Sequence, residues 1–442
     1  MKQNFQYIVM GVFGIFILIA VLLFSGAIKL PGDTSKTPPL LNKSLTLWGT
    51  LPRAAVIDVI NEFAQTRQMN LNYLEKDPDS IDREISEAIA AQQGPDLVLA
   101  PHEILIKHQS KFVHIPYTQV ADREYRDVFV DESRLFLLPD GILAFPMLLD
   151  PMIFYFNRTS YNNVGILNPP LTWKEVTTYA LKLNRKSGTE TILESGLPLG
   201  VFSNNINAKD TISLLLLQAG NPIVAISNTP NTQYATSALL DIYPGSDRPI
   251  AEYVIQFFTQ FSDPLKGSYT WNRAMPEARD SFASEQASQY IGFASEIPQI
   301  ATINPNINFD VAIMPQAEGA RAKKTFGRMY GLAVVKASKE QFAAFQTAQE
   351  MKEKDFSEKL LNGTQALFPI APTRKDILVT IPPTKEGPII YNSAVISAGF
   401  FDVSYADTKK IFEDMITQVV RNNLDTRQSL EEAHALLNTL LR

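Results

Sequence analysis

The amino-acid sequence predicts an α/β protein with a mostly parallel sheet, preceded by one N-terminal transmembrane helix. The sheet is predicted because apolar strands alternate with amphipathic helices along residues 45–100. The 442 residues are too many for one ordinary core, which suggests two lobes or domains in addition to the transmembrane helix. One observation predicts the transmembrane helix, because residues 3–28 contain no charged side chain.

The N-terminal segment 1–30 is long enough to anchor the chain in a membrane. Residues 8–24 are almost wholly aliphatic or aromatic, and roughly 20 such residues cross a bilayer core as a helix. The alternative is a cleaved signal peptide, because the small residues Ser25 and Ala27 follow the apolar stretch. We favour a retained anchor, because the stretch exceeds the usual signal-peptide core of about 7–15 residues. Lysines flank both ends, so charge does not fix the orientation.

Residues 31–44 are rich in Pro, Ser and Thr and predict a linker that holds the folded part, 45–442, away from the membrane. The chain contains no cysteine, which excludes disulfides, thiolate zinc sites, thiol catalysis and an acylated lipoprotein cysteine. The net charge is -6 and the basic residues are scattered, so no nucleic-acid partner is predicted.

The first elements predict βαβ units. Strands are predicted at 45–48, 69–74 and 97–100; Pro52 opens the first intervening helix, and Ser80 is placed to cap the second. Residues 141–155 are apolar on both sides of Pro146. Because proline cannot donate to a sheet ladder, we expect a chain crossing between lobes here and not a continuous central strand.

Later elements are predicted from capping residues and short apolar runs. Thr172 is expected to cap a helix, and further helices are predicted at 211–219, 250–261 and 275–284. Short strands are predicted at 309–314 and 332–335. The last hundred residues are expected to be mostly helical, with Ser429 and Glu432 forming a capping box at the start of the final helix.

Several segments in order resemble the extracellular solute-binding proteins of ABC importers, in the group that includes maltose-binding protein. They are PDLVLA at 95–100, the proline-containing stretch 141–166, the PPLTWKEV helix start within 168–183, and the segments 282–297, 309–338 and 415–441. The resemblance implies a two-lobed periplasmic-binding-protein fold of type II, a clamshell with discontinuous lobes. The first lobe would comprise 45–149 and 291–335, and the second 150–290 and 336–442.

The family motifs place aromatic residues at the expected cleft, where flat rings can cover the apolar faces of sugars. Asp150 stands alone in an apolar crossing; a cleft-facing role and a salt bridge or cap within the hinge are both open. Many family members have a tryptophan shortly after the crossing glycine, where this chain has Ser295 with Phe293 nearby. The predicted ligand-binding residues are Trp48, Asp150, Phe154, Tyr155, Trp271, Phe293 and Tyr330.

The resemblance implies an extracytoplasmic protein, held at the cell membrane by a single span, that delivers a small polar solute to an ABC permease by cleft closure. A sugar is favoured, with peptides, polyols and other small polar solutes behind. A ligand-sensing module that signals to a membrane partner is the alternative, and a glycan-acting enzyme is less favoured. No catalytic motif is present, and no cofactor or metal is predicted. The four histidines, His102, His108, His114 and His434, lack metal-ligand spacing and are expected at the surface.

Overall fold

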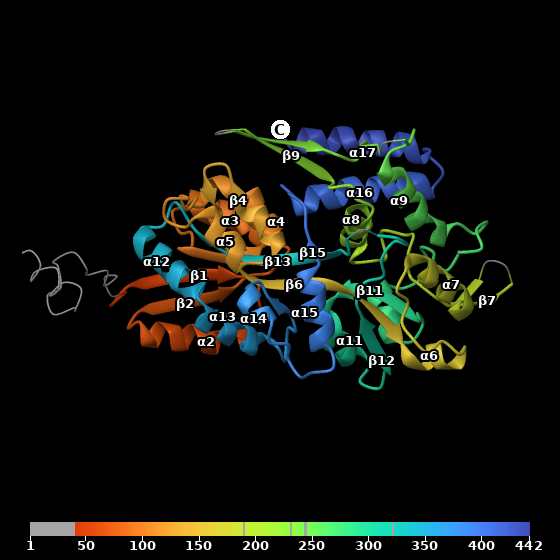
Figure 1. The fold of residues 1–442 in the computed structure, drawn as a ribbon, viewed down its shortest axis with the longest axis horizontal. Coiled ribbons are helices and arrows are strands. Elements are labelled where there is room, and N and C mark those ends of the chain that lie inside the picture. Colours follow the sequence, from red (N-terminus) through yellow and green to blue (C-terminus); the bar gives the residue numbers. More distant parts are fainter. Residues whose placement is uncertain (1–39, 189–190, 230–231, 243–244, 321) are drawn as a thin grey trace, which may run out of the picture.

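The structure is a computed structural model that describes residues 40–442 except 189–190, 230–231, 243–244 and 321 (Figure 1). The predicted anchor, 1–30, and the linker up to residue 39 lie outside the described residues. In the part of the chain that is described, no helix is both long and apolar enough to cross a membrane.

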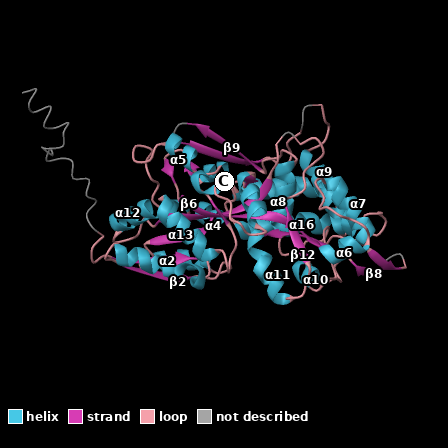
Figure 2. Cartoon of the chain, turned by 60° about the horizontal axis from the view of Figure 1, so that its bottom comes forward, coloured by secondary structure: helices cyan, strands magenta, loops and turns pink. Residues whose placement is uncertain are grey.

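A nine-stranded sheet connects two lobes that lie side by side (Figures 1 and 2). Its main path runs β11-β6-β13-β3-β1-β2, while β12 and β14 pair with β6, and β15 pairs with β13. The strands are β1 (Ser44–Gly49), β2 (Asn70–Glu75), β3 (Leu97–Pro101), β6 (Phe145–Asn157), β11 (Gln289–Phe293), β12 (Phe309–Ala312), β13 (Thr325–Val334), β14 (Ala371–Pro372) and β15 (Ser397–Ala398). The predicted βαβ units are confirmed, because β1 pairs in parallel with both β2 and β3. The expectation of a mostly parallel sheet is wrong, because the long strands β6 and β13 pair antiparallel with each other and with β11, β12, β14 and β3.

The first lobe surrounds β1, β2 and β3. Its helices are α2 (Arg53–Thr66), α3 (Ile81–Ala90), α4 (His102–Lys107), α5 (Asp122–Val128), α12 (Gln341–Met351), α13 (Lys354–Thr364) and α14 (Lys375–Leu378). The 3-10 segments η1 (Gln109–Lys111) and η2 (Asp131–Phe136) and the small hairpin of β4 (Leu137–Leu138) and β5 (Gly141–Ile142) complete it. Helix α2 buries the stripe Ala55, Val56, Ile60 and Ala64, which follows the predicted helical spacing.

The second lobe surrounds β11, β12 and the far half of β6. Its helices are α6 (Arg158–Asn163), α7 (Trp173–Leu183), α8 (Ala208–Gln218), α9 (Ile250–Thr259), α10 (Ala278–Ala283), α11 (Ile297–Ile303), α16 (Tyr405–Val420) and α17 (Thr426–Leu440). The 3-10 segments η3 (Gln260–Ser262) and η4 (Ala294–Glu296) and the hairpins β7 (Arg185–Ser187) with β8 (Thr191–Glu194) and β9 (Val224–Thr229) with β10 (Thr232–Ser237) belong to it. Helix α15 (Gly387–Val395) lies against β6 between the lobes (Figure 1).

The expectation that Pro146 prevents a continuous strand is wrong. Strand β6 runs unbroken through Pro146 and Pro151 and is buried along its whole length. A bulge accommodates the proline, because the β6–β13 register shifts between Tyr330 and Gly331, opposite this point. The predicted crossing is nevertheless present: one half of β6 pairs with β13 and the other half with β11 and β12.

The lobe boundaries differ from the expected ones in two segments. Residues 336–442 were expected wholly in the second lobe, but α13 packs on α2 of the first lobe through Phe63 and Phe356, whose ring centroids are 5.4 Å apart. Lys359 also forms an ion pair of 2.9 Å with Glu62. Conversely, the last three residues of β11 and the whole of β12, expected in the first lobe, pair with the second-lobe end of β6. These boundaries are set by contacts between residues that are far apart in the sequence.

Of the three predicted caps, at Ser80, Thr172 and Ser429, only that at Thr172 forms; Ser80 stands at the N-cap of α3, but its side chain makes no cap hydrogen bond. Thr172 caps α7 with a full capping box to Glu175. The final helix begins earlier than expected, with Asp425 as its cap accepting the backbone N–H of Gln428 at 2.8 Å. Ser429 instead donates from within the helix to the backbone oxygen of Met415, so the predicted capping box at Ser429 is wrong.

Candidate functional site

Charged side chains from both lobes meet where the lobes adjoin. We call this group the interlobe cluster; it consists of Glu103, Lys209, Asp210, Arg328, Asp402 and Tyr405. Glu103 lies on α4, directly after the carboxyl end of β3, which is where α/β proteins usually place ligand-binding groups. Lys209 and Asp210 begin α8 of the second lobe, and Arg328 lies on β13, which runs between the lobes.

Lys209 is the centre of the interlobe cluster. Its side chain is fully buried, and its ammonium nitrogen lies 2.6 Å from Asp402 and 4.0 Å from Glu103. The same nitrogen lies 4.0 Å from the ring centroid of Tyr405 and 5.3 Å from that of Phe400. Two carboxylates and two aromatic rings therefore surround one cation, and the contact with Glu103 joins the two lobes.

Arg328 organises the other half of the cluster. Its guanidinium lies 3.4 Å from the buried carboxylate of Asp210 and 4.2 Å from the ring centroid of Phe293. Its side chain keeps 25% of its surface exposed, whereas that of Asp210 is fully buried. A further polar contact joins the lobes nearby, because Lys107 of α4 donates to the hydroxyl of Ser404 at 3.3 Å.

Burial and pairing act against each other on the charges of the cluster. Burial lowers the pKa of Lys209, but the carboxylates of Asp402, Asp210 and Glu103 outweigh it, so this pKa lies above its usual value. Burial likewise opposes ionisation of Glu103, yet His102 and Lys209 hold its pKa below the usual range. The pKa of Asp210 is raised by burial despite Arg328 and Lys209. The ammonium of Lys209 and the carboxylate of Glu103 therefore stay charged although both side chains are buried.

Two histidines expected at the surface are buried, so that expectation is wrong. His102 is fully buried beside Glu103, with 3.3 Å between its Nδ1 and the carboxylate, and burial lowers its pKa. His108 is 5% exposed and its Nε2 lies 2.6 Å from Asp82. Both histidines belong to α4 or its end, where packing against β13 and α3 covers them.

A cavity of about 330 Å³ lies between the lobes, next to the cluster. Glu132 of η2 lines it from the first lobe, and Ile226 of the β9 hairpin lines it from the second lobe. Phe401, which follows β15 and is adjacent to Asp402, also lines it. Burial raises the pKa of Glu132 to about 8. A largely neutral carboxyl group therefore stands at this opening near neutral pH.

Four of the seven predicted site residues pack inside the lobes, away from the interlobe cluster. Trp271 is fully buried and donates its indole N–H to Asn204 at 3.0 Å. Phe154 and Tyr155 are fully buried on β6, and the Tyr155 hydroxyl donates to the backbone oxygen of Phe293. Trp48 is 7% exposed and lies under the ammonium of Lys76, 3.9 Å from its ring centroid.

The other three predicted residues border the cluster. Phe293 lies under the guanidinium of Arg328. Tyr330 lies two residues after Arg328 on β13. Asp150 pairs across the sheet with Arg328 and accepts the backbone N–H of Ser295 at 3.1 Å, which is the cap that the sequence left open. Burial raises the pKa of Asp150 to about 7 in spite of this bond.

The central residues of the cluster were missed, although the sequence contains a signal for them. Lys209 and Asp210 precede the apolar run ISLLLLQ, Arg328 lies within FGRMYGLAVV, and Asp402 follows SAGFF. Each charge therefore stands among apolar neighbours, as Asp150 does, and the argument applied to Asp150 covers all of them.

Comparisons with known proteins agree with this architecture. The model of the family described as "Bacterial extracellular solute-binding protein" matches residues 72–354. Among curated protein sequences, none matches the chain.

Solved structures of low sequence identity share the fold. A cyclo/maltodextrin-binding protein complexed with maltotetraose has a TM-score of 0.70 at 17% identity, over 92% of this chain and 99% of that one. The cyclic alpha-maltosyl-1,6-maltose binding protein from Arthrobacter globiformis has a TM-score of 0.72 at 13% identity, over 91% and 99% of the two chains. The Thermus thermophilus maltotriose binding protein bound with maltotriose has a TM-score of 0.66 at 14% identity, over 90% and 100%.

These similarities confirm the predicted maltose-binding type of fold and a binding protein rather than an enzyme. The family model covers well over half of the chain, from β2 to the start of α13. The chain belongs to the bacterial extracellular solute-binding protein family.

Proposed function

We propose that the protein captures a small carbohydrate between its lobes, at the interlobe cluster, and delivers it to an ABC importer. The observation on which this proposal rests is the contact between Glu103 of the first lobe and Lys209 of the second, 4.0 Å apart at the boundary of the lobes. A ligand bound there can contact both lobes at once, which a cleft that closes on its ligand requires.

The chemistry of the cluster suits a ligand rich in hydroxyl groups. A hydroxyl can donate to Glu103 or Asp402 and accept from Lys209 or Arg328, so sugar hydroxyls can bridge charges that now contact each other directly. Charge-assisted hydrogen bonds of this kind are about twice as strong as neutral ones. The aromatic faces of Phe400 and Tyr405, next to Lys209, offer apolar surface to sugar C–H groups.

Support for a sugar also comes from the structural relatives, whose names and complexes state maltodextrin, cyclic alpha-maltosyl-1,6-maltose and maltotriose. Support for delivery to a permease comes from the sequence motifs, which resemble those of the solute-binding proteins that serve ABC importers. We further propose that residues 1–30 anchor the protein to the cell membrane as a single span, with the two lobes extracytoplasmic, because residues 3–28 contain no charge.

For the lobes to close on a ligand, the ligand must bind the closed state more tightly than the open one. Changing a mostly open population into a mostly closed one requires about 5.5 kcal/mol of preference for the closed state. Direct contacts between the lobes, such as Glu103 with Lys209 and Lys107 with Ser404, add to the stability of a closed state, so the ligand has to supply less of this preference.

Isothermal titration calorimetry of the full chain with maltose, maltotriose and mannotriose tests the proposal. We expect heat of binding for at least one of these sugars, and loss of binding in Arg328→Gln. The matched control is Arg158→Gln, an arginine of the second lobe that lies outside the cluster and 3.8 Å from Asp310. No binding of any of the sugars by the folded protein, or unchanged binding in Arg328→Gln, would count against it.

A further inference from the structure

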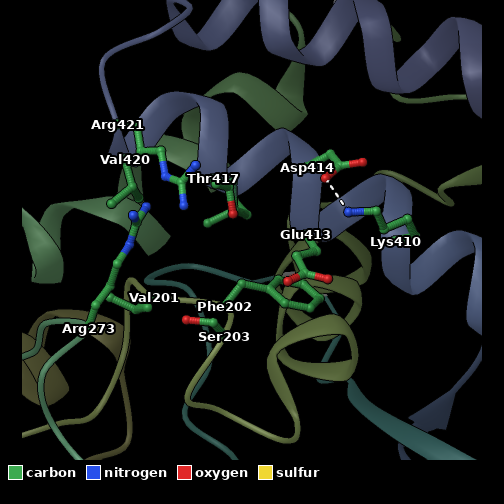
Figure 3. A pocket seen from close by; sticks show the side chains of 11 residues that line it. Val201, Phe202, Ser203, Arg273, Lys410, Glu413, Asp414, Thr417, Val420 and Arg421 are labelled. Carbon is green, nitrogen blue, oxygen red and sulfur yellow. Dashed lines mark hydrogen bonds and ion pairs between the residues drawn. The ribbon is translucent and has the colours of Figure 1, made fainter.

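A second pocket lies on the second lobe, on the side of α16, and contains two arginines without a carboxylate partner (Figure 3). Its volume is about 240 Å³. Arg421, at the end of α16, and Arg273, in the loop before α10, extend toward each other across it (Figure 3). Within the described residues, neither guanidinium forms an ion pair or a hydrogen bond.

This lack of partners sets the two arginines apart from the others of the same lobe. Apart from Arg442 at the end of the chain, each of the others lies within 4.0 Å of a carboxylate: Arg158, Arg185, Arg248, Arg279 and Arg427. Acidic residues are close by in the pocket, but Asp414 pairs with Lys410 at 2.7 Å, and Glu413 lies at the opposite end, beside Phe202 (Figure 3). Within the described residues, the end formed by the two arginines therefore has two positive charges without a carboxylate partner.

The walls of this end are held in place by a rigid base. The side-chain amide of Asn204 donates to the backbone oxygens of Asn272 and Met275, at 2.9 and 3.0 Å, and its oxygen accepts the indole N–H of Trp271. These bonds connect the loop of Ser203 with the loop of Arg273. Trp271 is fully buried beneath them, so the backbone on either side of Arg273 is held in place, while its exposed side chain keeps its freedom to meet a ligand.

Donors for an anion are present beside the arginines. The hydroxyls of Ser203 and Thr417 line the pocket, and Thr417 precedes Arg421 by one helical turn. A guanidinium offers a planar set of N–H donors that matches phosphate or sulfate oxygens in pairs. Burial and the neighbouring charge of Arg421 lower the pKa of Arg273, a cost that a bound anion would offset.

We propose that Arg273, Arg421, Ser203 and Thr417 form a binding site for a small tetrahedral oxyanion, a phosphate or sulfate group, separate from the interlobe cluster. The group could come from a free ion or from the headgroup of a phospholipid. In both cases the two guanidiniums would contact the oxyanion from opposite sides, and the hydroxyls would donate to its remaining oxygens.

The test is calorimetric titration of the full chain with inorganic phosphate and sulfate, with sodium chloride replacing them at equal ionic strength. In the double variant Arg273→Gln/Arg421→Gln we expect the affinity for phosphate to fall about tenfold or more, because two charge-assisted contacts are lost. The control is Arg427→Gln, one helix further along, whose arginine is paired with Glu431 at 2.7 Å. It should bind phosphate like the wild type.

Glycerol 1-phosphate, a soluble phospholipid headgroup, distinguishes the two sources. Tighter binding than inorganic phosphate supports a lipid headgroup, and equal or weaker binding supports a free ion. The proposal is overturned if phosphate and sulfate do not bind beyond the chloride control, or if the double variant binds them like the wild type. Sugar binding at the interlobe cluster should be the same in both variants, so the two proposals fail independently.

Discussion

The ammonium nitrogen of Lys209 lies 2.6 Å from a carboxylate oxygen of Asp402, and both side chains are fully buried. Removing two charges from water costs several kcal/mol for each, and the cost is recovered only when the partners stay together. The pair joins the beginning of α8 to the segment that enters α16. It therefore fixes the second-lobe half of the interlobe cluster.

Lys209→Met should destabilise the protein by about 3–5 kcal/mol, because Asp402 would remain as a buried charge without its partner. The free energy of unfolding, from urea titration followed by circular dichroism, measures this loss. Lys209→Met/Asp402→Asn should recover part of it, since neither charge then remains. A double variant no more stable than the single one would show that the two residues do not act as a pair.

Glu103→Gln should weaken carbohydrate binding about tenfold, because one charge-assisted contact from the first lobe is lost. Calorimetry with maltotriose measures the change. The control is Glu62→Gln, which removes an exposed ion pair with Lys359 in the same lobe and should leave affinity unchanged. Equal affinities of Glu103→Gln and the wild type for maltotriose would show that Glu103 does not contact the bound sugar.

Glu132 should make stability fall as pH rises. Its pKa is raised by burial from 4.5 to about 8, whereas in the unfolded chain it stays near 4.5. Between these values the folded protein holds a proton that the unfolded chain releases, so the stabilisation is complete below about pH 4.5 and is lost toward about pH 8. Other groups, such as His102, titrate alike in wild type and variant.

The measurement is the difference in unfolding free energy between Glu132→Gln and the wild type at several pH values. This difference should shift in favour of the variant as pH rises from about 5 to about 8. A difference independent of pH would contradict the raised pKa of Glu132.

Trp271→Phe should reduce stability without changing sugar affinity. The indole is fully buried and its N–H bonds to Asn204, so its loss removes a hydrogen bond and leaves space, at a cost of roughly 1–3 kcal/mol. Thermal unfolding and calorimetry on the same sample separate the two effects. Weakened sugar binding in a fully folded variant would show that Trp271 takes part in binding, as the sequence predicts.

Much of the fold could be predicted from the sequence because its signals are local. The strands near residues 45, 70 and 97 and the capping box at Thr172 depend on residue spacing and capping chemistry within a few positions. The continuity of β6 through Pro146 could not be predicted in this way, because it depends on a bulge in the β6–β13 pairing directly beside the proline. The packing of α13 on α2 likewise depends on residues nearly three hundred positions apart.

The candidate site was predicted only at its edge. Asp150 and Tyr330 border the cluster because their strands, β6 and β13, run between the lobes, and Phe293 borders it at the end of β11, under Arg328. Trp48, Phe154, Tyr155 and Trp271 were chosen for their aromatic rings, but large rings are also what fills a core. Lys209 and Asp402 come together only through folding, since 193 residues separate them in the sequence.

The most direct test of the central claim measures whether the lobes approach each other on a sugar. The chain has no cysteine, so Glu124→Cys on α5 and Glu432→Cys on α17 provide two exposed labelling sites, one on each lobe; Figure 1 shows the two helices. The distance distribution between spin labels at these positions is measured by pulsed electron resonance, with and without maltose, maltotriose or mannotriose. Closure on a sugar predicts a shift to shorter distances with at least one of them; distributions unchanged at saturating concentrations of all three would contradict it.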